Sequence, residues 1–90
     1  MRIEFDPAKD KANVEKHGVS LALASELSWE HALVWPDDRF EYNELRMIAL
    51  APDTKVLYFV AFVDYGDFYR IISLRPATRR EVKHYVKSFQ

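Results

Sequence analysis

The last quarter of the chain, residues 68–90, constrains the fold more than any other stretch. It begins with β-branched and aromatic residues, which suit a half-buried strand over Phe68–Arg75. Pro76 has no N–H to donate to a ladder, so the strand is predicted to end there. Period-two alternation predicts two sets of side chains: Tyr69, Ile71, Ser73 and Arg75 on one face, and Phe68, Arg70, Ile72 and Leu74 on the other.

A helix is predicted directly after this strand. Thr78 is followed three residues later by Glu81, the capping-box pattern that begins a helix. The apolar residues that follow recur at the spacing of one helix face: Val82, Tyr85, Val86 and Phe89. The opposite, solvated face carries Arg80, Lys83, His84 and Lys87. Arg75 and Arg79 flank the turn between strand and helix.

Charge divides the chain into two unequal parts. Residues 68–90 hold six Lys or Arg and one acidic residue, a charge of +5, whereas residues 1–67 hold seven basic and thirteen acidic residues, a charge of −6. The formal net charge of −1 therefore hides a strongly basic segment. Such a patch is compatible with binding to nucleic acid, although the whole chain is close to neutral. The alternative is a solvated amphipathic helix with no special ligand.

Length and composition predict a single domain over residues 1–90. An apolar fraction of 49% indicates a folded core, and the absence of cysteine excludes disulfides and thiolate metal sites. No apolar run is long enough to span a membrane, and the N-terminus lacks a hydrophobic signal region. A cytoplasmic location is therefore expected.

The remaining elements follow from local signals. Asp6 and Pro7 start a polar helix over 8–17 that Gly18 ends, and Ser20 caps a second helix over Leu21–Leu27. Three further segments are read as strands: a short one at 31–35, an alternating one within 39–50, and a continuous apolar one over Val56–Val63, typical of a buried central strand. The sequence thus predicts an α+β fold with two N-terminal helices, a three- to four-stranded antiparallel sheet and a C-terminal helix, the helices covering one sheet face.

Several of these segments together resemble one protein family. The residues that carry the resemblance are Phe5–Lys9, Asn13, Lys16–Val19, Glu44–Arg46, Arg70–Glu81 and Tyr85. They resemble BrnT toxins, the ribonuclease halves of BrnT/BrnA toxin–antitoxin pairs, which have a compact RelE-like fold. The resemblance implies metal-independent RNA cleavage, inhibition of translation, and neutralisation by a BrnA-like antitoxin. It also implies an antitoxin DNA-binding domain that reaches operator DNA, and a heterotetramer of two toxin–antitoxin pairs.

Metal-independent RNA cleavage needs groups that stabilise phosphate charge and groups that move protons. Arginine suits the first task because its planar fork binds phosphate bidentately. Arg75 and Arg79 are the catalytic candidates, since both can reach one phosphate near the start of the last helix. The candidates for holding flanking RNA are Lys16, Arg70, Arg80, Lys83 and His84.

The proton-transfer group has two candidates. His17 can titrate near neutrality, or it can merely complement, with Lys16, the carbonyl end of the first helix. Glu44 can act as a base, or it can form a surface ion pair with Arg46. Glu81 is expected to cap its own helix. A metal site is not expected, because the histidines at 17, 31 and 84 lack ligand spacing.

A second function remains open alongside cleavage. The same fold can serve as a non-catalytic module that binds a partner protein or joins a DNA complex through its basic helix. Expression of such a module in a bacterial host would be harmless.

Overall fold

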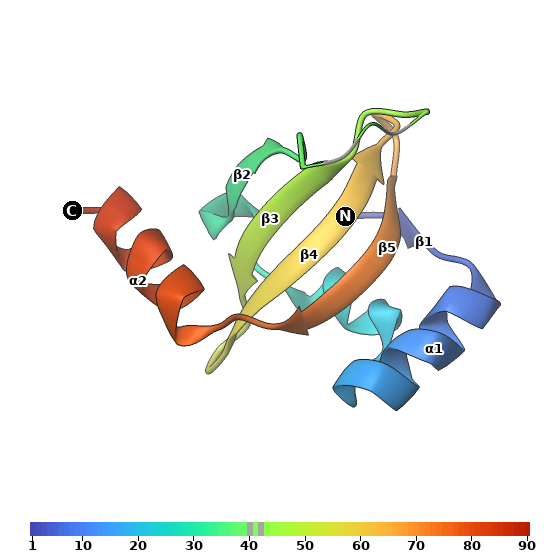
Figure 1. Cartoon of the computed structure of the whole chain (residues 1–90), viewed down its shortest axis with the longest axis horizontal. Helices are drawn as coiled ribbons and strands as arrows, with labels where there is room; N and C mark the ends of the chain where they lie inside the picture. Colours follow the sequence, from blue (N-terminus) through green and yellow to red (C-terminus); the bar gives the residue numbers. More distant parts are fainter. Residues whose placement is uncertain (40, 42) are drawn as a thin grey trace.

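The computed structural model describes residues 1–39, 41 and 43–90 (Figure 1). Its helical elements are α1 (Pro7–His17), the 3₁₀ helices η1 (Leu21–Glu26) and η2 (Trp29–His31), and α2 (Arg79–Ser88). Its strands are β1 (Ile3–Glu4), β2 (Leu33–Pro36), β3 (Met47–Pro52), β4 (Leu57–Asp64) and β5 (Tyr69–Pro76). The predicted α+β class is therefore confirmed.

The sheet differs from the prediction in strand number and direction. It has five strands in the order β1-β5-β4-β3-β2, and β1 pairs with β5 in parallel while the other pairs are antiparallel. The expected three- to four-stranded antiparallel sheet is therefore wrong. Strand β1 was missed because it has only two residues, too few to show a period of two.

The N-terminal helices are only partly as expected. Asp6 caps the start of α1, where its side chain accepts a hydrogen bond from the Ala8 N–H, and Gly18, with φ 75°, caps its end. The second predicted helix is the 3₁₀ helix η1, capped by Ser20, and η2 is an additional turn. The helix layout is thus corrected from two α-helices to one α-helix followed by two short 3₁₀ helices.

The prediction for 39–50 fails in its first half. Strand β3 begins only at Met47, and the described residues before it, 39, 41 and 43–46, are bends or irregular backbone. Phe40 and Tyr42, which belong to the predicted strand, lie outside the described residues. The alternating pattern was therefore a weak indicator here. The predicted strand at 31–35 is confirmed as β2, although it starts two residues later.

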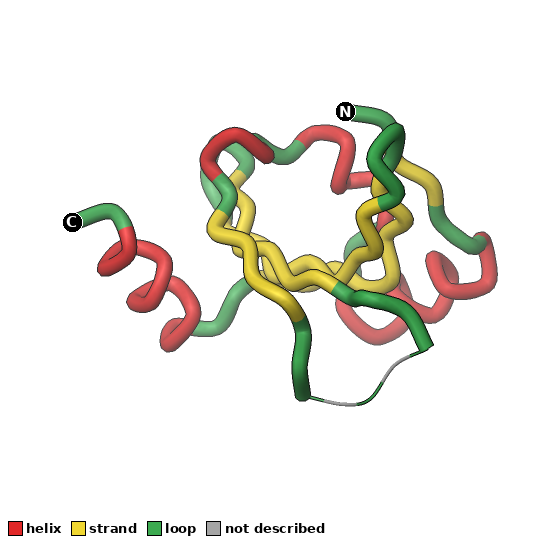
Figure 2. Tube along the Cα trace, turned by 90° about the horizontal axis from the view of Figure 1, so that it is seen from above, coloured by secondary structure: helices red, strands yellow, loops and turns green. Residues whose placement is uncertain are grey.

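The main core lies between the sheet and the 3₁₀ helices. Figure 2 shows η1 and η2 along one side of the curved sheet, which we call the first face. Its fully buried side chains are Leu21, Ala24, Ala49, Ala51, Val60, Phe62, Ile71 and Leu74. Trp29 from η2 packs edge-on against Phe62, with ring centroids 5.2 Å apart. The second face has a smaller cluster of Ile48, Leu50, Phe59 and Ala61.

A β-bulge in β5 corrects the predicted side-chain faces. Ala61 pairs with Ser73, but the next residue of β4, Phe62, pairs with Ile71, so one residue of β5 is extra. Ile71 and Leu74 consequently share the first face, whereas Ile72 packs against the second. Strict alternation had placed Ile71 and Leu74 on opposite faces. The bulge brings Ile72, Ser73 and Arg75 to the second face.

Helix α2 projects from the sheet instead of covering it, as Figures 1 and 2 show. None of its residues is buried. Its apolar side chains Val82, Val86 and Phe89 are 39%, 49% and 59% exposed. Only Tyr85 of the predicted apolar face packs on the second face, where its hydroxyl donates to the His31 carbonyl at 2.7 Å. The capping box of Thr78 and Glu81 is confirmed.

Candidate functional site

A groove of about 190 Å³ lies between α1 and β5. Its lining comes from two distant parts of the sequence: Lys9, Ala12, Asn13, Lys16 and His17 from α1, and Ile72 and Ser73 from β5. We call it the α1–β5 groove. Two lysines and a histidine around so small a space favour an anionic ligand.

Asn13 fixes α1 against the edge of β5 and thereby shapes this groove. Its Nδ2 donates to the Leu74 carbonyl at 2.8 Å, and its Oδ1 accepts from the Leu74 N–H at 3.1 Å. Nδ2 also donates to the Val19 carbonyl at 2.9 Å. The buried amide thus replaces a strand partner at β5 beyond the end of the short β1.

His17, in the last turn of α1, is the groove residue whose side chain ordinarily titrates closest to neutral pH. Partial burial lowers its pKa below 6.5, and the nearby positive charges of Lys16 and Arg75 lower it further. The imidazole is therefore mostly neutral at neutral pH and able to accept a proton. The structure brings three of the predicted site residues together: Lys16, His17 and Arg75.

Arg75 is held rigidly beside the groove. Its Nη1 and Nη2 donate to the two carboxylate oxygens of Glu81 at 2.8 and 2.9 Å, and its guanidinium carbon lies 4.1 Å from the centroid of the Phe59 ring. Nη1 also donates to the Pro76 carbonyl at 3.2 Å. Among the described residues no hydrogen bond uses Nε, so Nε–H and one N–H of Nη2 remain for a ligand.

Glu81 therefore does more than the predicted capping. Its carboxylate accepts from the Thr78 N–H at 2.8 Å and also binds Arg75. The hydrogen bond from Arg75 is the main cause that holds the pKa of Glu81 below its usual value, with the Thr78 N–H adding to it against partial burial. The carboxylate stays charged at neutral pH and ties the start of α2 to the end of β5.

A second guanidinium above the same ring was missed by the sequence analysis. Arg39 binds the buried Asp37 through Nε and Nη2 at 2.8 and 2.9 Å, and its guanidinium carbon lies 5.7 Å from the Phe59 ring centroid. Two arginine side chains thus lie over the Phe59 ring, and each forms an ion pair with a carboxylate. The signal in the sequence was the spacing of two residues between Asp37 and Arg39.

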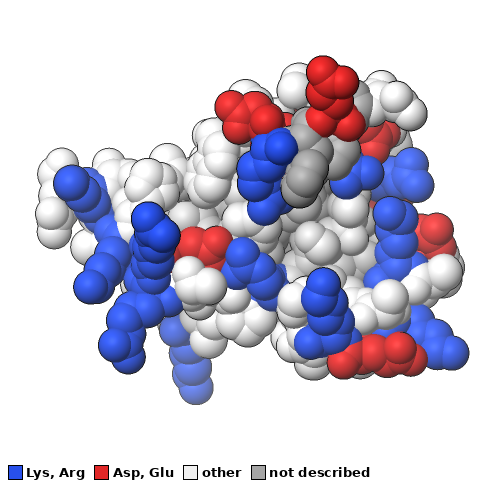
Figure 3. All heavy atoms as spheres, in the orientation of Figure 1, with Lys and Arg blue, Asp and Glu red and all other residues white. Residues whose placement is uncertain are grey.

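Four further basic candidates lie on α2, away from the groove. Arg79, Arg80, Lys83 and His84 all project from this helix, and the His84 ring is edge-on to Trp35 with centroids 5.9 Å apart. Figure 3 shows Lys and Arg side chains gathered over α2. Arg79 sits in the first turn of α2, whereas Arg75 is fixed on β5 by Glu81, so the two differ in how firmly they are held.

Glu44 and Arg70 lie at the other end of the sheet. Arg46 Nε is 3.5 Å from Glu44 Oε1, the ion pair that was the alternative to a catalytic role. Glu44 lines pockets with the residues around β3 and the β4–β5 turn, not the α1–β5 groove. Arg70, on β5, lines a separate pocket with the β1 segment.

Neither a metal cluster nor a membrane helix emerges in the part of the chain that the structure describes. No group of three or more His, Asp or Glu residues gathers there in a metal-binding arrangement. None of its helices is long and apolar enough to cross a bilayer.

Comparison with known proteins places the chain in one family. A search among curated proteins finds no significant match. The profile of the family described as "Ribonuclease toxin, BrnT, of type II toxin-antitoxin system" matches residues 5–81, which include α1, the whole sheet except β1, and the Arg75–Glu81 pair. The chain belongs to the BrnT family of ribonuclease toxins.

Proposed function

We propose that this toxin is a metal-independent endoribonuclease whose cutting site is the α1–β5 groove, and that it inhibits translation in the cytoplasm. One observation carries the proposal: Lys16 and a neutral His17 line the groove, and the anchored Arg75, two residues beyond the groove residue Ser73 on β5, is near enough for its charge to lower the pKa of His17. A base and a phosphate-binding guanidinium are what cleavage by the ribose 2′-hydroxyl requires. Family membership supplies the reaction class.

The groove residues divide the work between proton transfer and charge stabilisation. The imidazole of His17 accepts the proton of the 2′-hydroxyl, whose oxygen forms a bond to phosphorus. The bond from phosphorus to the 5′ oxygen breaks, and that oxygen takes a proton from water at the open mouth of the groove. Arg75 stabilises the negative charge on the phosphate through its unused N–H groups. The products are a 2′,3′-cyclic phosphate and a 5′-hydroxyl.

The cations of α2 hold a stretch of RNA that flanks the scissile phosphate. Arg79, Arg80 and Lys83 lie on the helix that starts where β5 ends. Contacts of this kind are independent of sequence and weaken with salt. Arg79 therefore serves binding more than bond cleavage, because it lacks the rigid support that Glu81 gives Arg75.

The exposed face of α2 also fits the antitoxin that a type II system contains. Val82, Val86 and Phe89 form an apolar stripe without cover from the described chain, and basic residues flank it. The occupant is an amphipathic helix of a BrnA-like antitoxin with acidic residues beside its apolar stripe. A second copy of α2 fits poorly, because its own Arg and Lys residues would face the same positive charges.

This arrangement explains neutralisation as competition. An antitoxin helix bound to α2 covers the cations that hold flanking RNA. Two toxin–antitoxin pairs joined through their antitoxins form the heterotetramer, and the antitoxins bind operator DNA. The non-catalytic module remains the second candidate function, because the uncovered stripe of α2 suits partner binding whether or not the groove cuts RNA.

Expression in a bacterial host separates these two functions. The wild-type toxin is expected to stop growth, and Arg75→Ala is expected to relieve the arrest because the phosphate loses its anchored guanidinium. Arg75→Lys should rescue little, since lysine lacks the planar fork. Lys55→Ala, in the exposed turn before β4, is the control and should remain toxic. Harmless expression of the wild-type chain would favour the non-catalytic module.

Substitution of Val86 tests the partner surface. Val86→Asp is expected to weaken the complex with the co-expressed antitoxin at least ten-fold, because a charge replaces an apolar contact. Val14→Asp is the matched control, a valine that is 44% exposed on α1. Unchanged co-purification of Val86→Asp would contradict the proposal. So would a toxin that dimerises alone through α2, shown by light scattering.

A further inference from the structure

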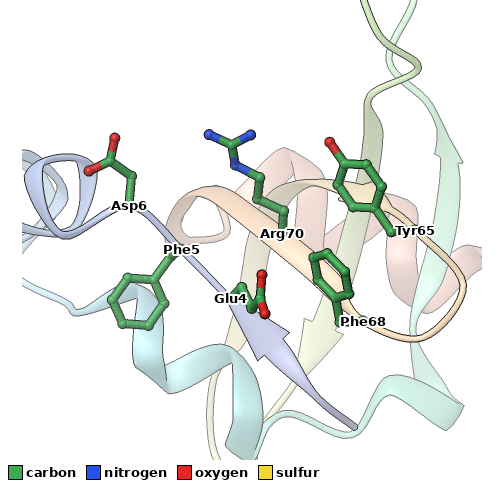
Figure 4. A pocket seen from close by; sticks show the side chains of 6 residues that line it. All are labelled: Glu4, Phe5, Asp6, Tyr65, Phe68 and Arg70. Carbon is green, nitrogen blue, oxygen red and sulfur yellow. The ribbon is translucent and has the colours of Figure 1, made fainter.

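A second pocket lies at the opposite end of β5 from Arg75. It has a volume of about 370 Å³ and is lined by Glu4, Phe5, Asp6, Tyr65, Phe68 and Arg70. Figure 4 shows Arg70 between Asp6 and Tyr65, with Glu4 and Phe68 beneath it. We call it the β1–β5 pocket. The cleavage mechanism proposed above makes no use of it.

The β4–β5 turn presents two aromatic rings at this pocket. The Tyr65 N–H donates to the Phe68 carbonyl at 3.0 Å, and Gly66 takes φ 89° between them, a value that glycine adopts without strain. The turn thereby stacks the two rings, with centroids 5.0 Å apart and planes 18° from parallel. Tyr65 is nevertheless 50% exposed, so ring surface remains open to a further planar group.

Beneath Tyr65 the stack continues into a cation. The Arg2 guanidinium carbon lies 5.0 Å from the Phe68 ring centroid, and Arg2 is in turn held by Glu4 at 2.6 Å. The Phe68 ring is therefore flanked by an ion pair at the surface, in which the Arg2 side chain is 63% exposed. Because the two rings are already stacked, they lose little conformational entropy when a flat ligand binds.

The charged residues of the pocket favour an uncharged ligand ring inside it and a phosphate at its rim. Glu4 and Asp6 line the pocket and disfavour an anion inside it. Both are engaged within the protein, Glu4 by Arg2 and Asp6 by the Ala8 N–H. Arg70 is exposed and, among the described residues, has no ion-pair partner within 4.0 Å. It can hold a phosphate at the rim.

The pocket and the groove are joined by one strand. Arg70 and Arg75 are five residues apart on β5, about 16 Å at a strand rise of about 3.3 Å per residue. Ile72 and Ser73, which line the groove, lie between them on the same strand. A short single strand of RNA that follows β5 can therefore reach both sites.

From this geometry we infer that the β1–β5 pocket binds an unpaired nucleobase of the RNA substrate, stacked on Tyr65 with the adjoining phosphate on Arg70. The inference builds on the proposed ribonuclease function and adds a base subsite to it. Stacking on aromatic rings is the common way proteins hold single-stranded RNA, since every base has a flat face.

The test is fluorescence anisotropy with a labelled 2′-O-methyl oligonucleotide of about ten residues, which lacks the attacking hydroxyl and stays intact. Tyr65→Ala is expected to weaken binding about ten-fold or more, and Tyr65→Phe to leave it within about two-fold. Arg70→Ala should weaken binding and reduce its salt dependence, whereas Lys55→Ala, the control for loss of one exposed charge, should not.

An oligonucleotide scanned with single abasic positions separates stacking from charge. The wild type is expected to bind more weakly when the base at one particular position is missing. Tyr65→Ala should bind that abasic oligonucleotide as well as it binds the intact one. Equal binding by Tyr65→Ala and wild type, or no sensitive position, would overturn the inference even if RNA is still cleaved. Conversely, a sensitive position in a toxin that fails to cut RNA would keep the pocket and remove the ribonuclease proposal.

Discussion

His17→Ala is expected to lower the rate constant of RNA cleavage by about 10²–10⁴-fold, the range for loss of a positioned general base. The imidazole lies in the α1–β5 groove with its pKa lowered by partial burial and by the charges of Lys16 and Arg75. It is therefore mostly neutral at neutral pH and available as a proton acceptor. Single-turnover cleavage of a defined RNA, under conditions where binding is saturated, measures the loss.

The pH profile of the same rate distinguishes a base from a binding residue. A lowered pKa means that His17 stays neutral down to a pH below 6.5, so the wild-type rate should be flat around neutrality and fall only in that more acidic range. His17→Ala should lose this acid limb. His31→Ala, an exposed histidine outside the groove, should keep both the rate and the profile. An unchanged acid limb in His17→Ala would assign the proton transfer elsewhere.

Asn13→Ala is expected to destabilise the fold by about 3 kcal/mol, because it leaves the N–H and C=O of Leu74 without partners at about 1–3 kcal/mol for each buried group. For a domain of this size that loss lowers the melting temperature by roughly 12–20 °C. Thermal unfolding followed by circular dichroism measures it. Lys11→Ala, on an exposed position of the same helix, should shift the melting temperature by no more than a few degrees. A similarly small shift for Asn13→Ala would show that its amide does not hold β5.

The sequence predicted the elements that have strong local signals. Asp6, Gly18 and Thr78 mark helix ends through their own backbone chemistry, and the structure confirms all three. The apolar run before Asp64 indicated the central strand β4, which is confirmed. These features depend on a few neighbouring residues and are therefore visible without any tertiary context.

Features that depend on contacts distant in sequence could not be predicted. Asn13 looked like one more polar residue on a polar helix, yet it is buried against a strand 61 residues away. The bulge in β5 has no sequence marker and changes which residues reach the second face. The projection of α2 from the sheet does not follow from periodicity, because an amphipathic helix has the same sequence pattern whether its own chain or a partner protein covers its apolar face. The position of Arg39 over Phe59 is likewise a contact between residues distant in sequence.

The candidate site shows the same division. The basic strand–turn–helix segment and His17 were singled out from the sequence, but only the fold brings His17 beside Arg75. The fold also ties Arg75, one of the two arginines expected to reach the phosphate, to Glu81. Glu44 is paired with Arg46 at the far end of the sheet, so His17 is the only one of the two proposed bases that lies by the groove.

Analysis of the RNA ends produced in the presence of EDTA tests the central claim most directly. Purified toxin incubated with RNA and EDTA should cut it and leave 2′,3′-cyclic phosphate and 5′-hydroxyl ends, and Arg75→Ala should leave the RNA intact. Cleavage that stops with EDTA, or fragments that carry 3′-hydroxyl and 5′-phosphate ends, would contradict attack by the ribose hydroxyl in the α1–β5 groove.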